Sequence, residues 1–402
     1  MTTSVPVAAT QTDSLRSFLE LDLLDNRYPA LHGMRVLGIV AVVQWHVTQI
    51  FKIYNNLPMS QAWATTSLSV FFGMDMFFVL SGFLIGSILL RSIETSGSQH
   101  VRRFYLRRVF RTFPSYYLVL TFLVATTALT ANQRHNLPFE YTYLTNYMSN
   151  HRDNVVMPWG WSLALEEQFY LVVPFLFFVL RKIEGDVGRL AVLLALWSST
   201  FFTRLALYLH PFGWGSDASF VDMYIRTHTR CDTLVAGIIL AYVHYRWRGP
   251  ISRWLESPRA RATLALPSLA CLWILIQPTM FGERAVRLVE VCSWGTLTSI
   301  MYFGWVLLVL HGGDGWMRRA LSAPIFRRIA TLGYGVYLVH IPVCYALITP
   351  RARDLVDRAG WSMAAVWPLS VVVLVLASLA FSYVLHVLVE KPSLKLRDRL
   401  AR

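Results

Sequence analysis

The stretch Met34–His46, MRVLGIVAVVQWH, is an apolar run that carries two ionisable side chains, Arg35 and His46, with ten residues between them. Eleven helical steps of about 100° return to the same helix face, about three turns and 16 Å further along. The run continues to residue 53 and predicts a membrane span, inside which ionisable residues face the protein interior and mark function. The structural alternative is an arginine that snorkels to the membrane surface and a core histidine bonded to a neighbour.

The whole chain has the composition of a polytopic membrane protein. Of its 402 residues 55% are hydrophobic and only 15% are charged, whereas about 25% are charged in soluble domains. The mean hydropathy is +0.45. The net charge of +14 is dispersed between apolar runs, which indicates arginines that flank membrane spans and argues against nucleic-acid binding.

Neither the cysteines nor the N-terminus suggests a secreted or metal-binding protein. Cys231, Cys271, Cys292 and Cys344 lie in or beside apolar runs without paired spacing, so no disulfide or zinc site is predicted. The N-terminal MTTSVPVAATQTDS is polar and lacks the basic and apolar regions of a signal peptide. We expect it to be a flexible cytosolic tail.

Apolar runs of span length follow one another along the chain. We identify ten candidates: 34–53, 68–90, 113–131, 160–180, 190–209, 227–244, 262–281, 288–310, 329–349 and 364–388. With the N-terminus in the cytosol, the inside segments hold 26 Lys and Arg residues and the outside segments hold 8, as the positive-inside rule requires.

The predicted fold is therefore all-α, a polytopic transmembrane bundle of about ten spans with both termini cytosolic. We divide it into a cytosolic tail (1–28), a membrane domain (29–395) and a short cytosolic C-terminal tail (396–402). The expected location is the cell membrane, the inner membrane of a bacterium, with membrane lipids as neighbours.

Five ionisable residues fall at one depth in this arrangement. At about 1.5 Å per residue, His46, Asp75, Glu166, Asp232 and His340 lie roughly 10–16 Å from a membrane surface, in a core about 30 Å thick. Each by itself has a structural reading as an ion-pair member or a hydrogen-bonded core residue. Together they predict a shared interior cavity.

A second polar concentration precedes the third span, where HVRRFYLRRVFRTFP places Arg102, Arg103, Arg107, Arg108 and Arg111 on the cytosolic side. One reading is topology and contact with anionic lipid headgroups. The other is a phosphate-binding platform, because guanidinium groups bind phosphate bidentately. Both readings can hold together.

A histidine with a nearby carboxylate is sufficient to remove a proton from an alcohol. The sequence contains no Gly-x-Ser-x-Gly or His-Glu-x-x-His motif, and neither Ser81 nor Ser162 has a recognisable nucleophile setting. Direct transfer from a long donor whose phosphates bind the arginines is the simpler prediction.

At this point the residues resemble acyltransferase family 3, polytopic membrane enzymes that O-acylate surface glycans and some small molecules. The resemblance covers about residues 28–395, with the motifs in order. They are Arg35 and His46; Gly73, Asp75, Phe77, Phe78, Ser81, Gly82 and Phe83; Arg107, Arg108, Arg111 and Pro114; Trp161, Ser162, Leu163, Glu166, Glu167, Phe169 and Tyr170; Thr229, Arg230, Asp232 and Gly237; Tyr334, Tyr337, Leu338 and His340; and Glu390 with Pro392.

The resemblance implies an acyl-CoA donor, usually acetyl-CoA, no permanently bound cofactor or metal, and a hydroxyl acceptor, often a sugar. Carried onto this chain, His46 is the expected base and Arg35 its essential companion, with Asp75 and Glu166 orienting the base or the acceptor. Donor-binding residues would be Arg35, Arg107, Arg108 and Arg111. Substrate-binding residues would be Trp161, Ser162, Arg230, Asp232, Tyr337 and His340.

Two departures and three alternatives accompany this interpretation. Gly333 stands where the family usually has a serine, and many relatives carry a C-terminal extracytoplasmic hydrolase-like domain, whereas this sequence stops about ten residues after Pro392. We therefore expect transfer to be completed in the membrane domain or handed to a separate extracytoplasmic partner. The alternatives are an exporter of a glycan intermediate, a non-catalytic scaffold, and an enzyme that acylates a small metabolite such as a macrolide sugar.

Overall fold

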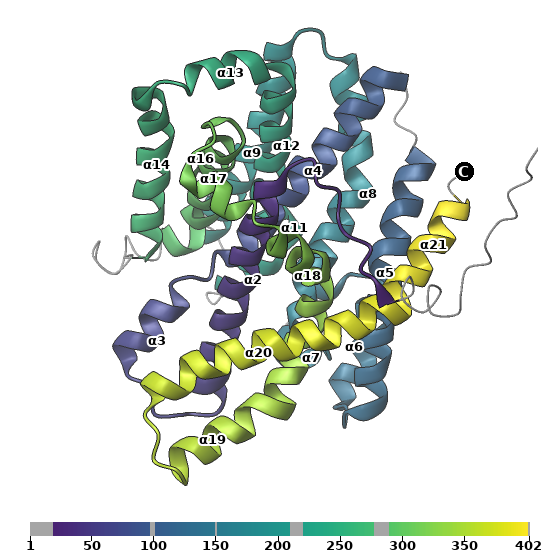
Figure 1. The fold of residues 1–402 in the computed structure, drawn as a ribbon. Coiled ribbons are helices and arrows are strands. Elements are labelled where there is room, and N and C mark those ends of the chain that lie inside the picture. Colours follow the sequence, from purple (N-terminus) through teal and green to yellow (C-terminus); the bar gives the residue numbers. More distant parts are fainter. Residues whose placement is uncertain (1–18, 97–100, 149–150, 210–219, 277–288, 401–402) are drawn as a thin grey trace, which may run out of the picture.

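The computed structural model describes residues 19–96, 101–148, 151–209, 220–276 and 289–400. Within these ranges the chain forms helices and no strands (Figure 1), which confirms the all-α prediction. The long helices are α2 (Pro29–Gln49), α4 (Gly73–Ser96), α5 (Val101–Thr126), α8 (Trp161–Lys182), α9 (Asp186–Leu209), α12 (Asp232–Arg246), α14 (Pro258–Ile276), α16 (Trp294–His311), α18 (Pro324–Val343) and α20 (Met363–Leu385).

Shorter elements connect or extend these helices. The short α-helices are α3 (Gln61–Leu68), α6 (Ala131–Tyr141), α7 (His151–Asn154), α10 (Phe220–Ile225), α11 (Thr227–Arg230), α13 (Arg248–Trp254), α17 (Trp316–Leu321), α19 (Thr349–Asp357) and α21 (Lys391–Leu400). The short π-helices are η1 (Ile50–Tyr54), η5 (Val289–Ser293), η6 (Cys344–Ile348) and η7 (His386–Glu390). The short 3₁₀-helices are η2 (Thr145–Tyr147) and η3 (Pro158–Gly160).

Nine helical segments of the described chain are long and apolar enough to cross a membrane, so the protein is a multi-pass membrane protein. This is one fewer than expected, and the difference is the predicted span 227–244. That segment forms the short α11 and then α12, whose 15 residues rise only about 22 Å. Residues 232–242 of α12 are all buried. A helix enclosed by other helices needs neither the length nor the composition of a lipid-facing span.

Helix α12 runs beside α4, and glycines set the close approach between them. A Cβ atom on Gly237 would lie 2.2 Å from the carbonyl oxygen of Val79, and one on Gly82 would lie 2.0 Å from that of Leu234. Small residues at such crossings let the backbones of membrane helices pack in direct contact. The tight α4–α12 pair forms one wall of the bundle interior.

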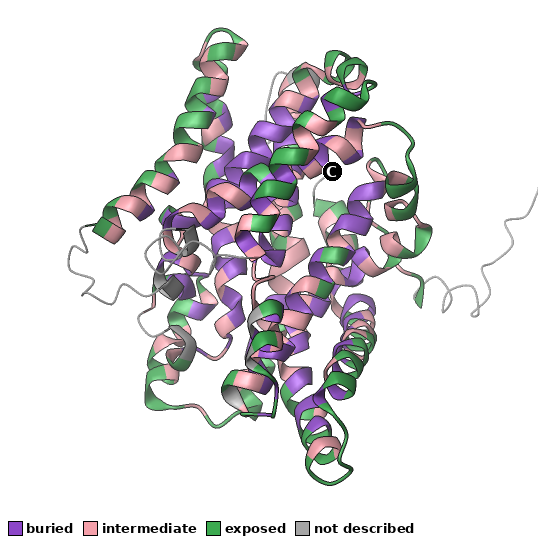
Figure 2. Ribbon diagram, turned by 90° about the vertical axis from the view of Figure 1, so that its left-hand side faces the viewer, coloured by how far each residue is buried: buried purple, intermediate pink, exposed green. Residues whose placement is uncertain are grey.

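The apolar surface follows the pattern of a lipid-facing bundle. Buried residues concentrate on the inner helices, while the outer helices carry exposed positions (Figure 2). On α8 the side chains of Leu171, Val172 and Phe175 are 60–63% exposed. In Figure 1, α13 lies at the top and α3 and α19 lie at the bottom, so segments predicted to face opposite sides of the membrane occupy opposite ends of the bundle.

Two predicted boundaries change in the structure. The arginine-rich stretch expected ahead of the third span lies within the first turns of that span's own helix, because α5 begins at Val101. The predicted N-terminal tail is held against the bundle over residues 19–28. There Leu24 accepts a hydrogen bond from Arg327 Nε (2.7 Å), and its amide donates to Thr331 Oγ1 (3.3 Å). We call residues 19–28 the N-terminal strap; residues 1–18 of the predicted tail lie outside the described chain.

Candidate functional site

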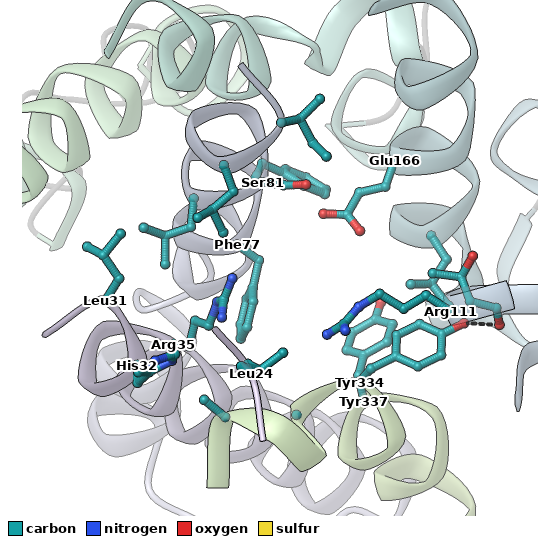
Figure 3. Close-up of a pocket in the computed structure, with 18 of the residues that line it drawn as sticks. Leu24, Leu31, His32, Arg35, Phe77, Ser81, Arg111, Glu166, Tyr334 and Tyr337 are labelled. Atoms are coloured by element: carbon teal, nitrogen blue, oxygen red, sulfur yellow. Dashed lines mark hydrogen bonds between the residues drawn. The ribbon is translucent and has the colours of Figure 1, made fainter. Parts of the chain in front are cut away.

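A cavity of about 470 Å³ lies inside the bundle, between the N-terminal strap and helices α2, α4, α5, α8 and α18. Its lining is mixed: apolar residues such as Phe77 and Leu84 alternate with arginines, hydroxyl groups and Glu166. Figure 3 shows side chains from five of these helices converging on one space. This combination of an apolar wall with a few convergent polar groups is typical of a small-molecule site.

One part of the cavity is lined by arginines from two helices. Arg35 of α2 and Arg111 of α5 extend toward the same space from opposite walls (Figure 3), and Arg107 and Arg108 also line it. None of the four forms a salt bridge with a described residue. Four arginines that share a cavity with the carboxylates of Asp25 and Glu166, and that form no salt bridge with them, repel one another, so the arrangement favours an anionic ligand. Of the predicted donor-binding residues, the structure brings all four to one cavity.

Another part of the cavity reaches a histidine pair. His340 of α18 lines the cavity, and its Nε2 lies 3.2 Å from Nδ1 of His46 on α2. The two rings meet edge to face with centroids 4.9 Å apart. Arg35 and His46 belong to the single continuous helix α2, so their separation along it is about 16 Å. The structure therefore places the predicted base beside His340 and roughly three helical turns from Arg35, but His46 itself is not among the residues that line the cavity.

The hydrogen bonds of the histidine pair fix which nitrogen carries the proton. Nδ1 of His340 lies 2.7 Å from the carbonyl oxygen of Tyr337, and Nδ1 of His46 lies 2.9 Å from that of Val42. A carbonyl oxygen only accepts, so both Nδ1 atoms are protonated and the neutral rings keep Nε2 bare. The Nδ1–H of His46 is then shared between Val42 and His340. Its Nε2, which has no hydrogen-bond partner in the described chain, is free to accept a proton.

Glu166 and Ser162 stand on the α8 wall of the same cavity. The carboxylate of Glu166 points into the open space, near Ser81 (Figure 3), and Ser81 Oγ lies 2.6 Å from the hydroxyl of Tyr170. The hydroxyl of Ser162 is hydrogen-bonded to that of Tyr337, which in turn donates to the carbonyl oxygen of Trp159. Glu166, Ser162 and Tyr337 are thus brought together with the arginines and His340 in one cavity.

Asp75 is placed elsewhere, in a fully buried ion pair. Its two carboxylate oxygens accept hydrogen bonds from Arg230 Nη1 (2.5 Å) and Nη2 (3.1 Å), and both side chains are 0% exposed. The Arg230 guanidinium also lies 3.9 Å from the ring centroid of Trp294 and 4.3 Å from that of Tyr224. Trp161 packs on the same cation at 5.7 Å. Neither Asp75, Arg230 nor Trp161 lines the cavity.

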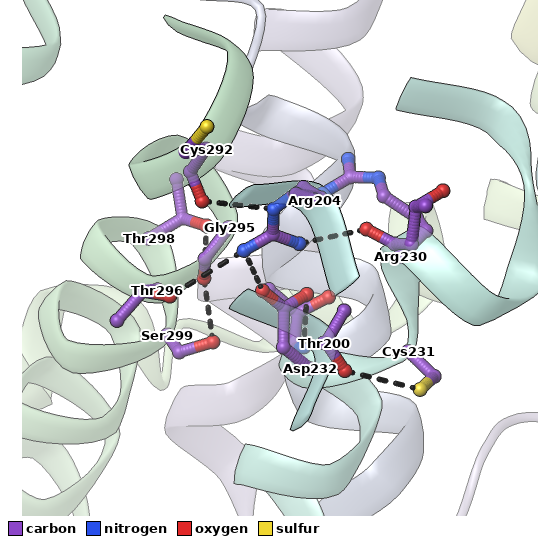
Figure 4. Close-up of polar contacts among 12 residues, drawn as sticks. Thr200, Arg204, Arg230, Cys231, Asp232, Cys292, Gly295, Thr296, Thr298 and Ser299 are labelled. Carbon is purple, nitrogen blue, oxygen red and sulfur yellow. Dashed lines mark hydrogen bonds and ion pairs between the residues drawn. The ribbon is translucent and has the colours of Figure 1, made fainter. Parts of the chain in front are cut away.

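Asp232 belongs to a second buried pair next to the first (Figure 4). Arg204 Nη2 lies 2.8 Å from Asp232 Oδ2, and the remaining Arg204 donors bind the carbonyl oxygens of Cys292 (2.9 Å) and Thr229 (2.7 Å). The polar groups around this pair come from three segments of the chain: α9, α11–α12 and η5–α16. The polar layer predicted at one depth is therefore two sites: a cavity lined by Glu166 and His340, with His46 in contact with His340, and a buried ion-pair cluster with Asp75 and Asp232.

Sequence reasoning missed two features of this region. Arg204 lies within the predicted span 190–209, and a charge at that depth is itself a signal that a buried partner exists. The N-terminal strap, which contributes Leu24, Asp25 and Tyr28 to the cavity wall, carries no such signal. Burial raises the pKa of Tyr28, so its phenol stays protonated beside His244, whose Nε2 lies 3.3 Å from the phenol oxygen.

The candidate site contains no constellation suited to a metal. Within the described residues, no three His, Cys, Asp or Glu side chains are grouped closely enough to hold an ion. The four cysteines are free thiols. His340, which lines the cavity, and its neighbour His46 have imidazole rings that can exchange a proton, and the arginines can bind an anion.

Known proteins are similar to this chain over most of its length. A family model described as an acyltransferase domain matches residues 28–387. The chain is 28% identical over 338 residues to the peptidoglycan O-acetyltransferase OatA of Listeria monocytogenes, covering 80% of this chain and 50% of the relative. It is 29% identical over 387 residues to the putative peptidoglycan O-acetyltransferase YrhL of Bacillus subtilis, covering 91% and 55%.

A putative O-acetyltransferase of Staphylococcus aureus is 26% identical over 330 residues, covering 78% of this chain and 50% of the relative. The chain thus spans about half the length of the curated relatives it matches. No solved structure is significantly similar to it.

Proposed function

The chain belongs to this family of acyltransferase domains, and from that premise we propose that it is a membrane O-acetyltransferase with acetyl-CoA as donor and a carbohydrate hydroxyl as acceptor. The observation that carries the proposal is one cavity with arginines on one part of its wall and His340 on another, with His46 in contact behind His340. The names of the Listeria and Bacillus relatives favour a cell-wall glycan as the acceptor and a bacterial cell membrane as the location.

The donor would bind with its phosphates at Arg35, Arg107, Arg108 and Arg111, which lie on the side predicted to face the cytosol. Each phosphate–guanidinium contact is a charge-assisted, often bidentate hydrogen bond. The pantetheine arm of CoA is long and thin, and it would run along α2 toward His340 and His46. This orientation places the thioester about three helical turns from the phosphates.

His46 would act as the general base. Its bare Nε2 takes the proton from the acceptor hydroxyl while the hydroxyl oxygen attacks the thioester carbonyl carbon. The imidazolium that forms keeps its Nδ1–H on the Val42 carbonyl and on His340 Nε2, which stabilises the positive charge. Collapse of the tetrahedral intermediate breaks the carbon–sulfur bond, and the departing thiolate receives the proton from His46 Nε2. The acetyl group is then an ester of the acceptor, and CoA leaves as the thiol.

Glu166 and Ser162 would bind the acceptor, because both side chains face the cavity without belonging to the arginine-lined wall. The buried ion pairs of Asp75 and Asp232 would act at a distance, by holding α4, α12 and the segments around them in register. A role of Arg230, Asp232 or Trp161 in direct substrate contact would require a rearrangement of this cluster.

The test is acetyl transfer in reconstituted membranes. Purified protein in liposomes is supplied with radiolabelled acetyl-CoA and a muropeptide or glycan acceptor, and the acetylated product is quantified. His46→Gln should reduce the rate by two to four orders of magnitude, as expected for loss of a general base. His135→Gln is the matched control, because His135 is exposed on α6. A stably folded His46→Gln protein with full activity would exclude His46 as the base, and export of unacetylated glycan would favour the transporter alternative.

A further inference from the structure

His32 is a buried titratable side chain that the mechanism above does not use. It lies on α2 three residues before Arg35, is only 3% exposed and lines the cavity. Residues three apart on a helix share a face, and Figure 3 shows His32 beside Arg35 on the same wall. Neither ring nitrogen of His32 has a partner with hydrogen-bond geometry in the described chain, although the backbone of the strap residue Asp25 lies nearby.

The groups around His32 are already committed to other contacts. The charged groups that act on His32 are Arg35, Arg327 and Asp25. Arg327 Nε donates to the carbonyl oxygen of Leu24 at 2.7 Å, and Asp25 Oδ1 accepts from the amide of Arg27 at 3.1 Å. Buried polar groups in proteins are nearly always hydrogen-bonded, and an orphaned one is costly. An unpartnered imidazole on the wall of an arginine-lined cavity is thus a vacant hydrogen-bonding position for a ligand.

We propose that His32 is a further residue of the acyl-CoA site. Its ring N–H donates a hydrogen bond to a phosphate oxygen of the acyl-CoA, held between Arg35 and Arg111. The proposal rests on the acyl-CoA donor proposed above and adds a specific contact to it. A neutral imidazole carries one N–H donor, and a phosphate oxygen accepts it without a change of protonation. A phosphate is also the ligand that the two arginines favour.

The nucleotide phosphate of the donor is a better candidate than a lipid headgroup. His32 faces the interior cavity, on whose wall the strap residues Leu24, Asp25 and Tyr28 also lie. The exposed apolar surface of α2 is formed by other residues, Leu37 and Val40. A lipid phosphate would therefore have to leave the bilayer and enter the bundle to reach His32.

The experiment measures binding to the full chain in nanodiscs made of phosphatidylcholine alone, which lacks a net-anionic headgroup. The probes are acetyl-CoA and S-acetylpantetheine, which has the same thioester but no phosphate. The variants are His32→Phe, which keeps a ring without a donor, His32→Leu as a second apolar variant, and His32→Gln, which keeps a donor. His135→Phe is the control on the exposed face of α6.

We expect the Kd for acetyl-CoA to rise about tenfold in His32→Phe and His32→Leu, a change of about 1.4 kcal/mol, and to rise less in His32→Gln. The Kd for S-acetylpantetheine should not change. Because His32 has no partner to lose, the melting temperature of the ligand-free variants should stay at or above the wild-type value.

Four results would overturn the inference. Equal acetyl-CoA affinity in the wild type and all His32 variants would remove His32 from the donor site and leave the proposed function standing. Equal weakening of both probes would indicate an effect on cavity shape instead of a phosphate contact. A difference between variants seen only when phosphatidylglycerol is added would assign the contact to a lipid headgroup. Failure of the wild type to bind acetyl-CoA would instead reject the proposed donor, and this inference with it.

Discussion

Replacing His340 by phenylalanine separates the base from the group that positions it. His340 is fully buried, and its Nε2 accepts a share of the His46 Nδ1–H at 3.2 Å, while the Val42 carbonyl accepts the other share at 2.9 Å. A hydrogen bond to a charged group contributes about 1.5–3 kcal/mol. The Val42 carbonyl remains in the variant and retains part of that stabilisation, so we expect a loss near the lower limit, about 1.4 kcal/mol. This is about a tenfold fall in kcat.

The assay is the reconstituted acetyl transfer, with kcat and the KM for acetyl-CoA measured separately and protein folding checked by thermal unfolding. The KM should stay near the wild-type value, because the phosphates would bind about three helical turns away. His340→Gln should recover part of the rate, since its amide oxygen can accept the Nδ1–H of His46. In contrast, His46→Gln should lose at least a further tenfold.

Two outcomes would refute this reasoning. A His340→Phe enzyme with wild-type kcat would show that the pair does not stabilise the imidazolium. A loss as large as that of His46→Gln would show that His340 itself takes the proton or contacts the reacting atoms, and that the hydrogen-bond argument has assigned the two roles wrongly.

The remaining predictions concern the two other groups of charges. Arg111→Gln should raise the KM for acetyl-CoA about tenfold or more through loss of a charge-assisted hydrogen bond, with no change for S-acetylpantetheine. The control is Arg358→Gln, because Arg358 belongs to an exposed ion pair and its loss should leave the KM at the wild-type value. An unchanged KM in Arg111→Gln would return the arginines to a purely topological role. Asp75→Asn leaves a buried guanidinium uncompensated and should destabilise the fold by about 3–5 kcal/mol, seen as a lower melting temperature, whereas Asp186→Asn, at a partly exposed pair, should change it little. A thermally unaltered Asp75→Asn protein would contradict a structural role for the buried pair.

Several elements were predictable because a local property decides them. A run such as Met34–His46 must be helical in a membrane, since no other structure satisfies its backbone hydrogen bonds within the segment. Because the segment is helical, Arg35 and His46 share one face of it. The uneven distribution of lysine and arginine predicts which loops face the cytosol. The exception is α12, which is shorter than the predicted span 227–244 and enclosed by other helices, because enclosure depends on tertiary packing and not on the composition of the segment itself.

The composition of the site shows where such reasoning ends. Depth along a span follows from counting residues, so the sequence correctly places His46 and His340 at a common level, but depth does not say which side chains face each other across the bundle. Asp75 and Glu166 have similar predicted depths, yet one is enclosed by Arg230 and aromatic rings and the other faces the cavity.

The sequence alone determined that this chain is a helical membrane protein, that its motifs resemble acyltransferase family 3, and which residue types are available for the chemistry. These follow from local hydropathy, spacing and charge. Only the tertiary structure decided that His340 meets His46, that Arg204 and Arg230 neutralise two of the expected site carboxylates, and that the strap and His32 complete the cavity wall. Such pairings depend on the rotation and crossing of helices far apart in the chain, which are set by packing contacts such as Gly82 against α12 and leave no periodic signal in the sequence.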